Sequence, residues 1–237
     1  MLETTRSINS FRLRKKISRA PLCKRTLDRQ TTDVVAYQTN RFIKFIAAYS
    51  LTRDSMGRPR KFSRETVLEK ALPVFWKHGF AGTSLQHLEQ ATGVNKSGLY
   101  SEFLDKQDLF FNALAYYYDH RGAPEILTAE PLGWGNIERF LRLGDPQDNG
   151  CTGCFSVNAL REFSTLSDEI RQLLIDSHRR LLPEIAANVR AENTKLSAEV
   201  IADIIMVFFS GVCVESNLHT TDSVDPVDHF MQAVRLL

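Results

Sequence analysis

The sequence predicts an all-α fold in which short helices follow one another closely. From residue 62 onward, apolar residues recur at the three- and four-residue spacing of amphipathic helices. Residues that cap helix N-termini, and glycines that end helices, stand at the boundaries of these segments. Neither the alternating pattern of a β-strand nor a glycine-rich phosphate loop occurs along the chain.

The first 55 residues differ from the rest of the chain, and we expect them to form a separate basic leader. Before residue 30 they hold nine lysines and arginines against two acidic residues. No regular period is kept there, apart from a possible short helix at 41–50. Three interpretations stay open: a disordered basic arm that touches nucleic acid, an organellar transit peptide, or a segment upstream of the true start at Met56.

The first two helices are marked by their caps. Ser63 is placed to cap a helix over 64–78, which Gly79 ends. Thr83 begins a T-S-L-Q capping box that opens a second helix. Gly93 stops that helix and leaves only a tight turn before the next one.

The third helix has little to bury. Asn95 caps it, Val94 packs onto Leu99 as a hydrophobic staple, and Phe103 is the second inward anchor. The other side chains face outward and are polar, which a helix chosen for packing alone would not require. They are Lys96, Ser97, Tyr100 and Ser101.

The rest of the chain also has helical periodicity. Asp105 caps a fourth helix, where Leu104 and Leu109 are expected to repeat the hydrophobic staple. The helices expected from here to the C-terminus cover 106–121, 135–143, 154–165, 168–191, 197–217 and 225–236.

Two helices joined by a tight turn, the second short and polar outside, make a helix-turn-helix. In that motif the second helix enters the DNA major groove. We expect Lys96 to donate to guanine O6 and N7, and Gly98 to let the backbone approach the phosphates. Thr83, Tyr100 and Lys106 are expected phosphate contacts, because helix N-termini also attract phosphate. The candidate DNA-binding residues are Arg58, Arg60, Lys61, Thr83, Ser84, Asn95, Lys96, Ser97, Gly98, Tyr100, Ser101 and Lys106.

Residues 57–110 resemble the DNA-binding domain of the TetR family of bacterial transcriptional regulators. The resemblance rests on GRPRK at 57–61, HGFAGTS at 78–84, ATGVNKSGLY at 91–100 and FLDKQDLF at 103–110. Two residues depart from the family pattern: Glu89 stands where a small residue is common, and Pro73 is unusual in the first helix.

The resemblance implies a homodimer with a three-helix DNA-binding head and a helical body that binds a small molecule and forms the dimer. It also implies repression at an operator in double-stranded DNA, released by that small molecule. The expected parts of the chain are the leader at 1–55, the DNA-binding domain at 56–104 and the effector-binding and dimerisation domain at 105–237.

The predicted helix 197–217 is apolar almost all round, so it must be buried on two sides. One side is expected to meet the partner subunit, and with 225–236 it would form the four-helix interface that the resemblance implies. The alternative is the central helix of a monomer. The expected interface residues are Ile201, Ile204, Ile205, Phe208, Phe209 and Val212.

An effector pocket is expected between the helices of the body, although aromatic residues at helical spacing also suit an ordinary core. Nothing in the sequence names the effector. The candidate lining residues are Tyr116, Tyr117, Trp134, Phe155, Asn158, Phe163, His178 and Phe208.

The pair Cys151 and Cys154 forms a CxxC motif in front of a predicted helix, where the helix dipole would lower a thiol pKa. A redox switch, a copper(I) or zinc site, and two ordinary cysteines are the open interpretations. Further metal ligands could come from His178, His219 or Cys213. We expect Cys154 to be the more buried of the pair and Cys151 to be exposed.

Two rival classes of function explain less of the sequence. A thiol oxidoreductase built on the CxxC motif would need the βαβ context of a thioredoxin-like fold, and no strand signal flanks it. A helical scaffold protein would leave the polar face of 95–101 unexplained. We therefore expect a DNA-binding regulator that is not an enzyme and needs no cofactor.

The composition indicates the compartment of the protein but not its partners. The net charge of +2 decides nothing about nucleic acid, so any basic patch must be local. Four irregularly placed cysteines suggest a reducing compartment. The longest apolar stretch, 201–214, is too short for a membrane span and contains Asp203. A cytoplasmic protein without a membrane partner is expected.

Overall fold

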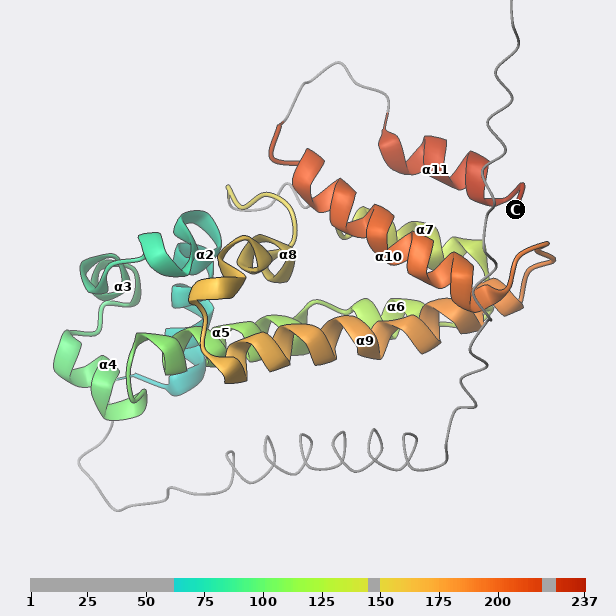
Figure 1. Ribbon diagram of the computed structural model, residues 1–237. Coiled ribbons are helices and arrows are strands. Elements are labelled where there is room, and N and C mark those ends of the chain that lie inside the picture. Colours follow the sequence, from blue (N-terminus) through green and yellow to red (C-terminus); the bar gives the residue numbers. More distant parts are fainter. Residues whose placement is uncertain (1–61, 145–149, 219–224) are drawn as a thin grey trace, which may run out of the picture. The chain divides into compact units, whose positions relative to one another are not determined.

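The computed structural model describes residues 62–144, 150–218 and 225–237 of the chain (Figure 1). These residues form helices and contain no β-strand, which confirms the all-α prediction. None of the helices in the described ranges is long and apolar enough to cross a membrane. The expected leader at 1–55, the arm residues Arg58, Arg60 and Lys61, and the candidate ligand His219 lie outside the described residues.

Helix α2, Arg64–Gly82, begins where the sequence predicts. The Ser63 hydroxyl accepts a hydrogen bond from the Thr66 backbone N–H at 3.0 Å, as an N-cap does. Gly79 interrupts the helical path with a φ of +71°, so the regular helix ends there and a short turn continues to Gly82. Pro73 is accommodated on the exposed side of the helix.

Helix α3, Leu85–Thr92, begins one residue later than expected. Ser84, not Thr83, is its N-cap: the Ser84 hydroxyl accepts from His87 N–H, and His87 Nδ1 accepts from Ser84 N–H. The expected capping box at Thr83 is therefore wrong by one position. The Thr83 side chain is only 1% exposed, because its hydroxyl turns inward and donates to the Gly79 carbonyl.

Helices α4, Lys96–Glu102, and α5, Lys106–His120, carry the predicted caps. Asn95 accepts from the Gly98 backbone, and Asp105 accepts from the Asp108 backbone. The expected staple from Leu104 is wrong, since that side chain is 83% exposed. Its backbone N–H is held by the Asp108 carboxylate at 2.9 Å, and the head is closed instead by Phe103, which is buried.

The body follows the predicted helix order with two differences. A five-residue helix, α6, lies between α5 and the next predicted helix; Pro124 in its first turn and its shortness hide it from a periodicity search. The helix predicted over 154–165 is an α-helical turn followed by a 3₁₀ segment. The bounds are α6 Ala123–Leu127, α7 Trp134–Arg142, α8 Phe155–Ala159, η1 Leu160–Thr165, α9 Asp168–Arg190, α10 Ala198–Glu215 and α11 Pro226–Val234.

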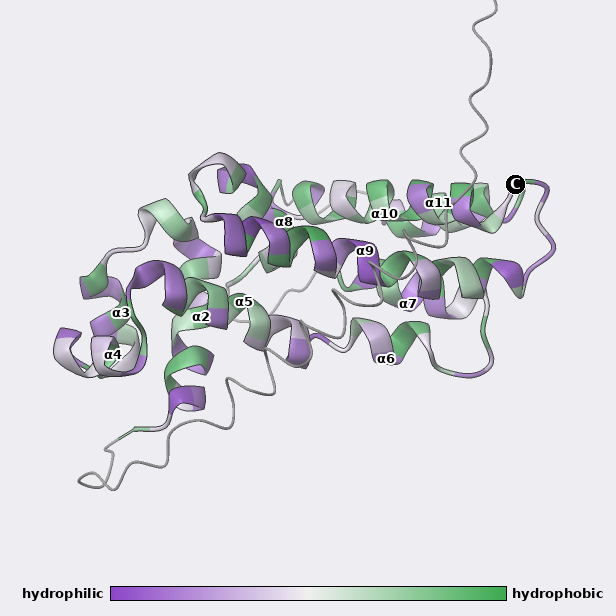
Figure 2. Cartoon of the chain, turned by 60° about the horizontal axis from the view of Figure 1, so that its bottom comes forward, coloured by the Kyte–Doolittle hydropathy of each residue, from purple (hydrophilic) through white to green (hydrophobic). Residues whose placement is uncertain are grey.

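Helix α9 is the axis of the body. It packs against α10 along much of its length and also meets α5, α6 and α7 (Figure 1). Hydrophobic residues cover most of α10, as Figure 2 shows. The division expected after residue 104 is not marked by a gap in packing, because α2 contacts both α5 and α8. That boundary stays a proposal.

Candidate functional site

The pair α3 and α4 presents the polar surface that the sequence predicts. Leu99 and Phe103 are each 1% exposed and anchor α4 to the head. The opposite face is open to solvent and carries Lys96, Ser97, Tyr100 and Ser101. The Ser101 hydroxyl donates to the Gly98 carbonyl at 2.7 Å, which leaves Lys96 and Tyr100 as the long side chains able to reach outward.

Glu89 has a role at this surface that sequence reasoning missed. Its carboxylate accepts a hydrogen bond from the Lys96 backbone N–H at 2.5 Å. One of the unpaired amides at the N-terminus of α4 is thereby satisfied by a side chain from α3. The acidic residue that departs from the family pattern thus ties the two helices of the motif together. Glu89 and Lys96 stand seven residues apart across the turn, so no local pattern in the sequence signals this contact.

The packing of the head explains why a glycine stands at position 98. A Cβ atom at this position would lie 2.6 Å from Val94 Cγ1 and 3.3 Å from the Asn95 carboxamide oxygen that caps α4. Val94 is buried, so it has little room to move away. The missing side chain therefore makes room for the staple and the cap, and the approach of the Gly98 backbone to phosphates stays a prediction.

Lys106 and Thr83 are engaged within the protein. The Lys106 ammonium donates to the carbonyls of Phe80 at 2.9 Å and Thr83 at 3.0 Å, and lies 4.5 Å from the Phe80 ring centroid. The Thr83 hydroxyl donates to Gly79 at 2.6 Å. Both side chains therefore hold the turn between α2 and α3. A side-chain phosphate contact from Thr83 is a wrong expectation, because the side chain is buried.

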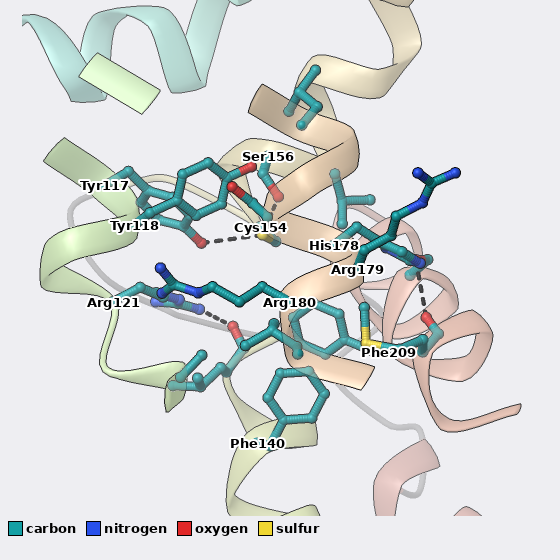
Figure 3. Close-up of a pocket in the computed structure, with 18 of the residues that line it drawn as sticks. Tyr117, Tyr118, Arg121, Phe140, Cys154, Ser156, His178, Arg179, Arg180 and Phe209 are labelled. Atoms are coloured by element: carbon teal, nitrogen blue, oxygen red, sulfur yellow. Dashed lines mark hydrogen bonds between the residues drawn. The ribbon is translucent and has the colours of Figure 1, made fainter. Parts of the chain in front are cut away.

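A cavity of about 220 Å³ lies in the body between α5, α9 and α10 (Figure 3). Of the eight residues expected to line a pocket, two do so: Tyr117 and His178. Burial, with the charge of Arg179 beside it, lowers the pKa of His178, and Asp203 opposes that shift. The side chains that sequence reasoning missed come mainly from α9 and α10, including Leu174, Arg180, Met206 and Phe209.

The other aromatic residues expected in the pocket are placed elsewhere. Phe155 lies in a buried cluster where its ring centroid is 5.5 Å from that of Phe110. Tyr116 stacks on His120 at 4.0 Å, and Phe208 stacks on Phe230 at 3.9 Å.

The last three of the expected lining residues are also outside the cavity. Phe163 lies under Arg171 at 5.9 Å, and the Asn158 amide donates to the Thr152 carbonyl at 3.0 Å. Trp134 begins α7 and does not reach the cavity. Sequence periodicity marked all of these residues as inward but could not separate core from cavity wall.

Comparison with known proteins identifies the head. A family model described as "Bacterial regulatory proteins, tetR family" matches residues 67–113, which span most of α2 and all of α3 and α4. Residues 67–113 are therefore similar to the DNA-binding part of this family. The fold predicted from the resemblance, a helix-turn-helix head with an all-α body, is thereby confirmed.

Curated TetR relatives match about half of the chain. "HTH-type transcriptional repressor ComR" of Escherichia coli (strain K12) is 44% identical over 132 residues, which is 53% of this chain and 63% of that protein. "Uncharacterized HTH-type transcriptional regulator YezE" of Bacillus subtilis (strain 168) is 38% identical over 116 residues, 45% of this chain and 58% of that protein. The match therefore spans about three fifths of the length of these relatives.

Solved TetR structures share the fold over a longer stretch. The E. coli NemR structure, in its reduced form, has a TM-score of 0.62 at 19% identity and covers 73% of this chain and 95% of its own. A cysteine mutant of the TetR-family regulator CifR, complexed with a 26-base-pair operator, has a TM-score of 0.60 at 22% identity, covering 75% and 96%. At these identities the likeness concerns the fold.

The CxxC motif is not arranged as expected. Cys151 is 8% exposed and Cys154 is 5% exposed, so the expectation of an exposed Cys151 is wrong. The loop that carries Cys151 folds against α10, where Gly153 approaches the Cys213 carbonyl too closely for any side chain. Among the described residues, no group of three potential ligands could hold a metal ion.

Cys154 is paired with Cys213 of α10. A hydrogen bond from the Cys213 thiol is the largest cause that lowers the pKa of Cys154, to about 5, and bonds from Ser156 and Tyr117 add to it. The Tyr117 hydroxyl lies 3.1 Å from Cys154 Sγ, and burial raises the Tyr117 pKa well above its ordinary value, so it donates. The same pairing raises the pKa of Cys213. The thiolate character belongs to Cys154, which also lines the cavity.

The exposed face of α10 differs from the interface expected from the sequence. Ile201, Ile205, Phe209 and Val212 are each at most 8% exposed within one chain, so these four are core residues and not interface residues. The apolar side chains left exposed on α10 form a stripe at helical spacing: Val200, Ile204, Val207 and Val214.

Proposed function

We propose that the chain is a transcriptional repressor that binds a palindromic operator as a homodimer and leaves it when a small molecule enters the cavity. The observation that carries the DNA-binding part is α4, a capped helix anchored by two buried residues with Lys96 and Tyr100 pointing outward. The name of the E. coli relative, a transcriptional repressor, supports repression as the direction of control.

In this proposal Lys96 reads a base edge and Tyr100 contacts a phosphate. Ser84, Ser97 and Ser101 lie on the same exposed surface of the motif and can add phosphate contacts. Arg58, Arg60 and Lys61, which precede the described head, would reach the adjacent minor groove or phosphates, as basic arms do. We retain the division into a DNA-binding domain at 56–104 and an effector-binding domain at 105–237, acting on DNA in the bacterial cytoplasm.

Selection of bound sites from random duplex DNA tests the DNA-binding proposal. The wild-type chain should enrich a palindrome whose half-sites lie about one helical turn apart, because each head of a dimer reads one major groove. A chain with Lys96→Ala and Tyr100→Phe should enrich a more degenerate site, since both substitutions lie on the exposed face. Failure of the wild type to enrich any sequence would contradict the proposal.

The exposed stripe on α10 supports the dimer. Val207 is 74% exposed and Ile204 39% exposed, with Val200 and Val214 on the same face. An exposed apolar stripe of this kind on a helix marks a surface that another protein covers. With α11 beside it, the stripe provides the surface for a two-fold interface between copies of the chain.

Sedimentation of two matched variants tests the dimer. Val207→Glu places a charge in the centre of the stripe and should give a folded monomer, whereas Val207→Leu keeps the apolar surface and should stay dimeric. If Val207→Glu sediments as a dimer of wild-type stability, the interface lies elsewhere.

A second candidate mechanism of release is favoured by the pairing of Cys154 with Cys213. Hydrogen peroxide would convert the two thiols into a disulfide with release of two water molecules, and this would strain the junction of α8 and α10. Cys154→Ser and Cys213→Ser should each stay on operator DNA when the wild type is released by peroxide, whereas Cys151→Ser should respond as the wild type does. Equal release of all four proteins would refute this mechanism.

A further inference from the structure

The cavity between α5, α9 and α10 carries arginine charge that no carboxylate in its wall balances. Arg121, Arg179 and Arg180 line it, together with His178, and none of the residues that line it is an aspartate or glutamate. Arg121 is half-buried, and such an arginine is normally paired with a carboxylate, whereas Arg180 is exposed. Neither Arg121 nor Arg180 is joined to an acidic residue of the described ranges by an ion pair.

Arg121 is held in place but only partly satisfied. It follows the last residue of α5, and its Nη2 donates to the Leu143 carbonyl at the end of α7. The guanidinium lies 5.6 Å from the ring centroid of Tyr117. Its Nε is buried and has no hydrogen-bond partner. An unsatisfied buried donor is costly, so this edge of the guanidinium is available for an acceptor that the chain itself does not supply.

Arg180 completes the positive end of the cavity. No hydrogen bond or ion pair joins its guanidinium to another described residue. Figure 3 shows the Arg180 side chain extending from α9 toward Arg121, whereas the neighbouring Arg179 extends in a different direction, away from Arg121. A ligand oxygen near Arg121 would therefore also lie within reach of Arg180. Arginine forks of this kind are suited to planar carboxylates.

The other end of the cavity is apolar. Phe140 and Phe209, whose rings stack at 4.5 Å, stand in its wall with Leu174 and Met206. A cavity of about 150 Å³ can hold benzene. At about 220 Å³, this one has room for an apolar body of roughly eight carbons.

We propose that the cavity binds a small organic monocarboxylate, with its carboxylate between Arg121 and Arg180 and its apolar body against Phe140, Phe209 and Met206. The inference rests on the proposed function only in naming this ligand as the effector. The charge of the cavity decides against an amine, which two arginines would repel. It also decides against an uncharged ligand, which would leave the half-buried guanidinium of Arg121 without an anionic partner.

Titration calorimetry with three probes of one chain length tests the inference on the full chain. Octanoate should bind with a dissociation constant in the micromolar range. Octan-1-ol should bind at least tenfold more weakly, and octylammonium should not bind. If the alcohol or the amine binds as tightly as octanoate, or if octanoate fails to bind, the inference is wrong.

Two neighbouring arginines provide a matched pair of variants. Arg180→Gln should weaken octanoate binding at least tenfold and leave octan-1-ol binding unchanged, because only the carboxylate uses the guanidinium. Arg179 also lines the cavity, but its side chain extends away from Arg121 (Figure 3), so Arg179→Gln removes the same charge and should weaken octanoate much less. Equal losses in the two variants would mean that general charge, and not a contact in the cavity, attracts the anion.

The effector part of the proposed function is tested separately by adding octanoate to the complex of the chain with its selected operator. If octanoate releases the DNA from the wild type but not from Arg180→Gln, both the carboxylate site and its role as the effector site are supported. Octanoate binding without DNA release would leave the carboxylate site standing and refute its role as the effector site.

Discussion

Lys106→Met distinguishes a structural role of this lysine in the head from a contact with a DNA phosphate. The substitution keeps an unbranched apolar side chain over Phe80 but removes the ammonium that donates to the carbonyls of Phe80 and Thr83 at 2.9 and 3.0 Å. Both carbonyls belong to the turn that joins α2 to α3. Without the lysine, that turn loses the contacts that fix its position on α5.

The expected cost follows from the contacts that are lost. Hydrogen bonds to a charged group contribute about 1.5–3 kcal/mol each, and Lys106 is half-buried, so the lower value applies to both. We therefore expect the free energy of unfolding to fall by about 3 kcal/mol. For a chain of this length, that corresponds to a decrease in Tm of about 6–12 °C.

Scanning calorimetry of Lys106→Met and Lys96→Met measures this difference. The Lys96 side chain lies on the exposed face of α4 and makes no contact that holds the head, so Lys96→Met should keep the wild-type Tm. If Lys106→Met has the Tm of the wild type and loses only DNA affinity, the lysine is a phosphate contact and its structural role is refuted.

Three further predictions concern Gly98, Cys154 and Ser84. Gly98→Ala should destabilise the head by about 1–2 kcal/mol in urea unfolding, because overpacking against Val94 outweighs the gain in helix propensity; a more stable variant would contradict this. The pKa of Cys154 is lower in the folded protein than in the unfolded chain, so ionisation of this thiol stabilises the fold. That stabilisation is fully present above the unfolded pKa of about 9 and is lost as the pH falls toward 5. The stability difference between wild type and Cys154→Ser should therefore shrink over that range in urea unfolding, and a constant difference would show an ordinary thiol. Ser84→Ala should cost about 1 kcal/mol in the same unfolding, because its hydroxyl caps α3; an unchanged stability would contradict Ser84 as the cap.

Local features of the fold could be predicted from the sequence because they depend on near neighbours. The caps Ser63, Asn95 and Asp105 stand where their side chains meet a backbone N–H three residues on. The cap of α3 was misplaced because Thr83 and Ser84 fit the local pattern equally well. Only the bond from Thr83 to Gly79 and its burial, both set by the turn after α2, decide between them.

Long-range pairings could not be predicted in the same way. The CxxC spacing suggests that Cys151 is the partner of Cys154, yet the structure supplies Cys213 from a distant helix. Sequence reasoning recognised that α10 is apolar all round but could not tell which stripe faces α9. Ile205 turned out to be buried and Val207 exposed, and this difference arises only when α9 and α10 pack.

One measurement tests most directly whether α4 reads the DNA. Fluorescence anisotropy gives the affinity of the wild type and of Lys96→Ala for the selected operator at several salt concentrations. The wild-type affinity should fall linearly with the logarithm of salt concentration, as released counterions require. Lys96→Ala should weaken the selected site by about 1–3 kcal/mol and relax the preference at one base pair of each half-site. Unchanged affinity and unchanged base preference in Lys96→Ala would contradict the assignment of α4 as the reader.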